Sequence, residues 1–216
     1  MNLKIFRARL IEIARSQSRY ADVAHDLRHT LRVLRISEKI GLIEKADLDI
    51  LLPAAIFHDV IISPKHHPRA RSDSIMSADF ARKILCSIRR YPEQKIEYVC
   101  AAIAECAFTK ESVSHTLEGR ILQDADRLDA LGALGIMRAF ATTGQLRIPF
   151  YHENNPFCRK RKPDPKLYGV DFFFTRLLKL TSGMHTVTGL KLAKQRTGYI
   201  RKFLTQLDKE LNQSNK

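Results

Sequence analysis

The stretch Leu51-Leu52-Pro53-Ala54-Ala55-Ile56-Phe57-His58-Asp59-Val60 places a histidine and an aspartate at the end of an apolar run. Unpaired polar groups are costly to bury, so both side chains need a partner if this run lies in the core. A metal ion is one such partner. The alternative is a helix cap or a solvated surface pair, and the chain contains a second such dipeptide, His25-Asp26.

Two other segments supply side chains of the same kind. His29 lies upstream, and Asp126 lies within Gln123-Asp124-Ala125-Asp126-Arg127-Leu128-Asp129. Two imidazoles and two carboxylates can surround one divalent cation and leave positions for water and a phosphate oxygen. The candidate ligands His29, His58, Asp59 and Asp126 therefore indicate a metal-dependent phosphohydrolase.

Four motifs resemble those of the HD-domain metal-dependent phosphohydrolase family, in its YedJ/YpgQ-like branch. They are His25-Asp26-x-x-His29-x-x-Arg32-Val33, Ala54 to Val60, Pro64-Lys65-x-His67-Pro68, and Gln123 to Ile136. The stretch Leu177 to Leu180, with Met184, Thr186 and Gly189, extends the resemblance over nearly the whole chain. The resemblance implies hydrolysis of a nucleotide by a metal-activated water. Cleavage of a nucleoside or deoxynucleoside triphosphate to monophosphate and pyrophosphate is the leading possibility, and phosphomonoester or phosphodiester hydrolysis is the alternative.

The resemblance also assigns roles to residues. The family's metal-binding aspartate sits in an Ala-Asp-x-Leu context, which selects Asp126, with Asp124 as the alternative. The cation is expected to be Mn, Mg, Co, Ni or Fe, because the ligands are nitrogen and oxygen without thiolate. Positions implied to help catalysis are Arg32, which could hold Asp59, Asp126 or a substrate phosphate, and Lys65 and His67 at the substrate phosphate. Asp129 is implied to orient a ligand or to pair with Arg127. The simpler alternatives are a core-edge His29 with an Arg32 salt bridge, and a solvated basic loop at 65–67.

The chain departs from this branch at two positions. Cys106 stands where a histidine is usual at the end of the fifth helix, and Phe172 follows Asp171 where a histidine is usual. Both changes delete an imidazole near the expected site, which affects the expected substrate preference, binding of a second metal and rate. We expect Cys106 to be a buried small apolar group rather than a nucleophile.

Composition limits the class of protein and its partners. The chain has 216 residues, enough for one full core, and four cysteines without Cys-x-x-Cys spacing, which favours the cytoplasm. No segment approaches the ~20 apolar residues of a membrane span, so we expect a soluble protein. The net charge of +14 favours anionic partners, which include nucleotides, nucleic acid and an anionic membrane. The basic run 159–166 is typical of a solvated loop, and a degenerate HD module that binds nucleotide or nucleic acid without turnover is the alternative function.

Helical periodicity dominates, which predicts an all-α fold. We expect one domain over 1–216, with a metal core at about 20–140 and a helical extension at about 145–216. Thr116 can cap a helix, Pro53 either bends the third helix or begins it, and 144–165 is either a lid or a surface excursion. The expected helices cover about 2–16, 26–41, 45–61, 69–89, 93–107, 117–130, 132–143, 166–180 and 186–212.

Overall fold

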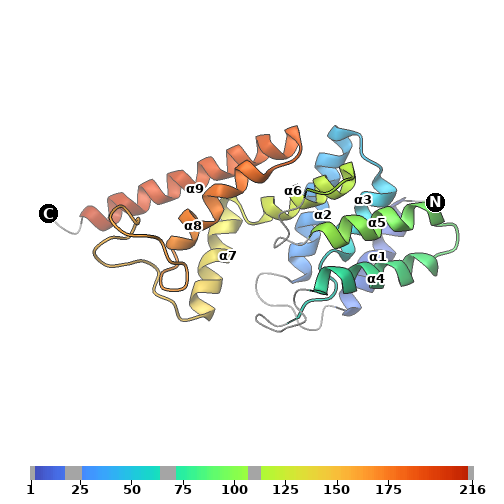
Figure 1. Ribbon diagram of the computed structural model, residues 1–216, viewed down its shortest axis with the longest axis horizontal. Coiled ribbons are helices and arrows are strands. Elements are labelled where there is room, and N and C mark those ends of the chain that lie inside the picture. The colour runs from blue at the N-terminus through green and yellow to red at the C-terminus, as the bar shows by residue number, and fades with distance from the viewer. Residues whose placement is uncertain (1–2, 18–25, 64–71, 107–112, 214–216) are drawn as a thin grey trace. The chain divides into compact units, whose positions relative to one another are not determined.

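The computed structural model describes residues 3–17, 26–63, 72–106 and 113–213. Within these ranges every regular element is a helix, which confirms the all-α prediction (Figure 1). The helices are α1 (Leu3–Gln17), α2 (Leu27–Glu44), α3 (Leu48–Phe57), α4 (Asp73–Cys86), α5 (Glu93–Cys106), α6 (Leu117–Asp129), α7 (Gly132–Gln145), α8 (Asp171–Thr175), the 3-10 helix η2 (Leu177–Gly183) and α9 (Val187–Gln213).

The chain divides into two compact units, Met1–Asp126 and Arg127–Lys216. The boundary falls inside α6, earlier than the limit of about 140 expected for the metal core. Whether both units form the single domain expected from the sequence stays a prediction, and each unit is described by itself.

Helix α3 is the central element of the first unit. All residues from Ile50 to Phe57 are buried, and the helix packs against α1, α2, α4 and α5. A helix that is apolar on every side is stable only when it is enclosed by other elements, and each large aliphatic or aromatic side chain buried here contributes about 1.5–3 kcal/mol. The predicted core segment is thus the helix that delivers His58 and Asp59.

Pro53 lies inside α3, so the prediction of a helix beginning at Pro53 is wrong. The helix begins at Leu48, where the side chain of Asp47 accepts a hydrogen bond from the backbone N–H of Asp49 at 2.9 Å. Proline has no N–H for the carbonyl four residues earlier, which belongs to Asp49. The hydroxyl of Tyr91 donates to that carbonyl oxygen at 2.8 Å instead.

The second unit packs α7 and η2 against α9, with α8 against η2. Phe140, Phe173 and Phe203 form an aromatic cluster, with ring centroids 5.6–6.1 Å apart. The prediction of one helix over 166–180 is wrong, because α8 ends at Thr175 and a 3-10 helix follows. The backbone of Arg176, at φ −132° and ψ −64°, makes the break.

The segment 146–170 contains no regular element, yet it is tied to the second unit. Backbone hydrogen bonds join Gly169 N–H to Pro149 O and Val170 N–H to Phe150 O, at 2.9 and 2.7 Å. Both terminal guanidinium nitrogens of Arg161 donate to the buried carboxylate of Asp171, at 2.5 and 2.6 Å. The two ends of the segment are therefore bonded to each other and its middle is bonded to α8, and a lid role stays a prediction.

Candidate metal centre

Asp26 sets the position of His29. Its side chain caps α2 and accepts a hydrogen bond from the backbone N–H of His29 at 2.9 Å. His29 is fully buried. The first His-Asp dipeptide of the sequence therefore supplies a cap, which is the common use of an aspartate at this position.

The end of α3 sets the position of His58. The helix ends at Phe57 and His58 is its C-cap, so the two residues of the second His-Asp pair leave the helix just as it terminates. The Nδ1 atom of His58 lies 2.9 Å from the carbonyl oxygen of Ala55. A carbonyl oxygen only accepts hydrogen bonds, so Nδ1 carries a proton and Nε2 is the ring nitrogen that faces the other candidate ligands.

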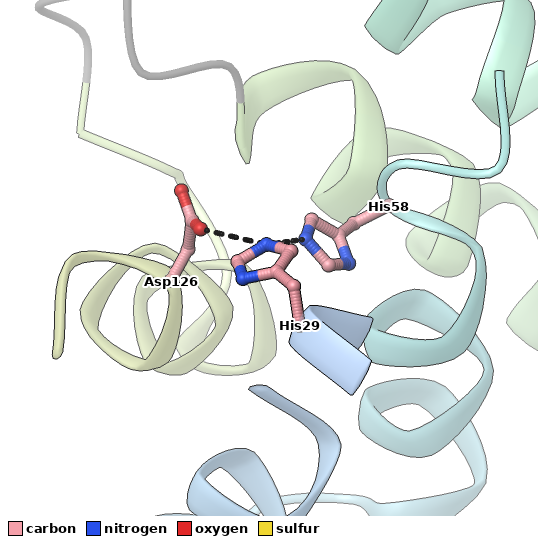
Figure 2. A group of neighbouring side chains, drawn as sticks. All are labelled: His29, His58 and Asp126. Carbon is pink, nitrogen blue, oxygen red and sulfur yellow. Dashed lines mark hydrogen bonds and ion pairs between the residues drawn. The ribbon is translucent and has the colours of Figure 1, made fainter. Parts of the chain in front are cut away.

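The two imidazoles meet through their Nε2 atoms, which are 3.3 Å apart. Asp126 places Oδ1 at 3.4 Å from Nε2 of His29, and Asp59 places Oδ2 at 3.6 and 3.5 Å from Nε2 of His29 and His58. Figure 2 shows His29, His58 and Asp126 pointing toward one another from α2, the end of α3 and α6. Residues up to a hundred positions apart thus converge on one point.

These distances fit a shared divalent cation. Neighbouring ligands of an octahedral ion with bonds of about 2.1 Å lie about 3 Å apart, which is slightly less than the separations of 3.3–3.6 Å that join His29 to His58 and Asp126 and join Asp59 to both imidazoles. The donor atoms of His29, His58 and Asp126 all lie within 4.8 Å of one another. Asp59 approaches both imidazoles but stands outside that tightest group. Two facing Nε2 atoms and two carboxylates form a donor set that suits a borderline or hard metal ion.

The electrostatics of Asp126 agree with this arrangement. Burial alone would raise its pKa, but the hydrogen bond from His29 and the two nearby imidazoles outweigh burial and the opposing charge of Asp59. The pKa of Asp126 is therefore held below its usual value, and the carboxylate is ionised at neutral pH.

The other predicted residues fall in different places. Arg32 is half-buried on α2, one turn after His29, and Asp124 is fully buried on α6. Lys65 and His67 lie outside the described residues. Asp129 is buried in the second unit, where its Oδ2 accepts from Nη1 of Arg138 at 2.6 Å. The catalytic roles of Arg32, Lys65, His67 and Asp129 stay predictions.

Side-chain hydrogen bonds that were not expected from the sequence join α6 to the end of α5. Nε2 of Gln123 donates to the carbonyl oxygen of Glu105 at 2.8 Å, and Oε1 of Gln123 accepts from the N–H of Ser114 at 3.2 Å. The carboxylate of Glu105 accepts from Ser114 Oγ and pairs with Nδ1 of His115. Gln123 precedes Asp126 by three residues, so these hydrogen bonds fix the turn of α6 that carries the candidate metal ligand Asp126. Cys106, next to Glu105, is buried as expected.

A helical fold that gathers His29, His58 and Asp126, with Asp59 beside the two imidazoles, has the arrangement of the HD-domain class, whose members bind a divalent metal. The HD domain model matches residues 26–131. YpgQ of Bacillus subtilis is 31% identical over 190 residues, covering 87% of this chain and 84% of YpgQ. The chain belongs to the HD-domain family, as its motifs predicted.

Solved structures agree with this placement. The crystal structure of Bacillus subtilis YpgQ in complex with ADP superposes with a TM-score of 0.74 at 28% identity, covering 97% of both chains. An HD-superfamily hydrolase from Bacillus thuringiensis gives a TM-score of 0.73 at 26% identity, covering 97% of this chain and 98% of that one. Among the described residues, no helix is both long and apolar enough to cross a membrane.

Proposed function

We propose that this protein hydrolyses a nucleotide with one divalent cation held by His29, His58, Asp59 and Asp126. Our leading reaction is cleavage of a nucleoside or deoxynucleoside triphosphate to the monophosphate and pyrophosphate. The observation that carries the proposal is the meeting of two Nε2 atoms at 3.3 Å, flanked by two carboxylates. Membership of a family with known hydrolases supports the reaction class, and the ADP complex of YpgQ supports a substrate with a nucleoside and a pyrophosphate.

The chain's own residues prepare this site. The hydrogen bond from His58 Nδ1 to Ala55 O keeps Nε2 available as a ligand, and the Asp26 cap fixes the start of the helix that holds His29. The carboxylates of Asp59 and Asp126 would balance the two positive charges of a bound divalent cation. A divalent cation, when bound, supplies a water of lowered pKa as nucleophile and an electrophile for phosphate oxygens.

Arg32 is the described cation best placed to serve the substrate. It lies three residues after His29 on α2, so both side chains share one face of that helix. A guanidinium group there can donate two parallel hydrogen bonds to phosphate oxygens and stabilise the charge that grows on them. Lys65 and His67 are proposed to add positive charge from the segment that follows the His-Asp pair.

Product analysis with metal-stripped protein tests the proposal. The protein is reloaded with Mn, Mg, Co or Ni and incubated with nucleoside and deoxynucleoside triphosphates, monophosphates and a phosphodiester. We expect metal-dependent release of pyrophosphate that disappears in H58A and persists in H152A, which removes a histidine of segment 146–170. Phosphate release would favour phosphomonoester hydrolysis. A bound cation without any turnover would favour the degenerate binding module.

A further inference from the structure

Positive charge is concentrated in the second unit. Residues Arg127–Lys216 hold 17 Lys or Arg against 6 Asp or Glu, a net +11, whereas Met1–Asp126 holds 20 against 17, a net +3. The candidate metal centre lies in the nearly balanced first unit. The metal chemistry therefore does not account for most of the chain's charge of +14.

Helix α9 carries exposed cations on one side only. At 100° per residue, its five exposed Lys and Arg side chains fall within an arc of about 100° and span about 27 Å along the helix axis. The α9 basic face consists of Lys191, Lys194, Arg201, Lys202 and Lys209. Gly198 lies inside the same arc, and a Cβ built there would meet no atom within 4 Å, so the middle of the face is open. The buried residues Ala193, Ile200 and Leu204 lie on another side of the helix.

The basic segment 159–166 borders this face. Nη2 of Arg159 pairs with Oδ2 of Asp208 on α9 at 2.6 Å, and Asp208 lies at the edge of the arc. Asp208 is the acid of α9 nearest to the basic face, because Glu210, the other acid of the helix, points away from the arc. The ion pair with Arg159 therefore neutralises the negative charge closest to the face. The segment also exposes Lys160, Lys162 and Lys166.

We propose that the α9 basic face binds nucleic acid through its phosphate backbone. A band of cations about 27 Å long on one side of a helix complements a linear polyanion. Val187 is the one large apolar residue in the arc and lies at its end, so the face lacks the apolar anchors by which surface helices enter membranes. Aromatic residues are absent from the arc, which favours contacts to phosphates over base stacking and makes the binding independent of sequence.

Titration of the full-length protein with labelled DNA and RNA duplexes of about 20 base pairs tests this proposal. The variant K191Q/K194Q/R201Q/K202Q removes four charges from the face. The control R9Q/K39Q/K83Q/R89Q removes four charges from exposed positions of the first unit. Circular dichroism and thermal melting establish that both variants fold.

We expect the wild-type affinity to fall with salt at a log–log slope of about −4 to −5, as five phosphate contacts require. The α9 variant should bind at least about tenfold more weakly at low salt with a slope about 3–4 units shallower, while the control stays within about threefold of wild type. Equal losses in both variants would show that net charge alone drives binding and would overturn the proposal. Saturable binding to phosphatidylserine vesicles without binding to either duplex would also overturn the proposal. The absence of any saturable binding would overturn it as well.

Discussion

The hydroxyl of Tyr91 lies 2.8 Å from the carbonyl oxygen of Asp49, the backbone acceptor that Pro53 leaves without its helical partner. A side chain 42 residues away thus completes the hydrogen bonding of the helix that carries His58. Burial raises the pKa of Tyr91, and the charges of Asp49 and Asp47 raise it further, so the hydroxyl remains a donor at any physiological pH.

Replacement of Tyr91 by Phe should therefore lower the free energy of unfolding by about 1–3 kcal/mol, because the Asp49 carbonyl loses its donor. Urea unfolding measures the loss, and Y98F, at a tyrosine that is 50% exposed, is the matched control. In a P53A background the alanine N–H can serve the same carbonyl, so Y91F should cost less there. An equal cost in both backgrounds would show that Tyr91 stabilises the protein by packing alone.

Replacement of Asp126 by Asn should remove a metal ligand while keeping the shape of the side chain. Loss of an outer partner alone typically costs 10–100-fold in metal affinity, so loss of a ligand should cost more than about 100-fold and abolish turnover. Metal content and product release measure both effects. D79N, at an exposed aspartate of α4, should behave as wild type. A metal-replete, active D126N would move the assignment to Asp124.

Gln123 should affect the site without touching the cation. Its side chain bonds Glu105 O and Ser114 N–H, so Q123A should loosen the turn of α6 before Asp126. We expect metal affinity to fall about tenfold, as for other residues that orient ligands, with the stoichiometry still one ion per chain. Titration with Mn by calorimetry checks this, with Q206A on the exposed side of α9 as the control. Unchanged affinity would restrict Gln123 to holding the helices together.

The Arg161–Asp171 pair should give stability that depends on pH. Burial would raise the pKa of Asp171, but the hydrogen bonds from Arg161, the Asp164 N–H and Cys158 outweigh burial and lower it. A carboxyl with a depressed folded pKa stabilises the protein above its unfolded pKa of about 3.9, and this contribution is lost as pH falls through the folded pKa.

Replacement of Asp171 by Asn should therefore cost about 3–5 kcal/mol at pH 7, because it leaves a largely buried guanidinium without its charge partner. The difference from wild type should shrink below about pH 4. Urea unfolding at several pH values measures both. A cost that does not change with pH would mean that the hydrogen-bond geometry of Asp171, rather than its charge, stabilises segment 146–170.

Apolar periodicity was sufficient to predict most helices, because α2, α5, α7 and α9 each bury one continuous side. It failed at 166–180, where the break at Arg176 leaves no mark in the apolar pattern. The candidate metal ligands could be named from the sequence because their residue types are unusual together and their motifs match a family, and their role stays a prediction. The hydrogen bonds that support these residues could not be predicted, because only tertiary packing brings the partners together. These pairs are Tyr91 with Asp49, Gln123 with Glu105, and Arg138 with Asp129.

The candidate ligands lie on or directly after α2, α3 and α6, and long stretches of sequence separate these three helices along the chain. A cation bound by all of them would cross-link these helices, and the unfolded chain, in which they are far apart, would not hold it. By thermodynamic linkage, each tenfold rise in free metal above the dissociation constant would then add about 1.4 kcal/mol to the free energy of unfolding. The melting temperature of the protein should therefore report site occupancy, even for a metal that supports no catalysis.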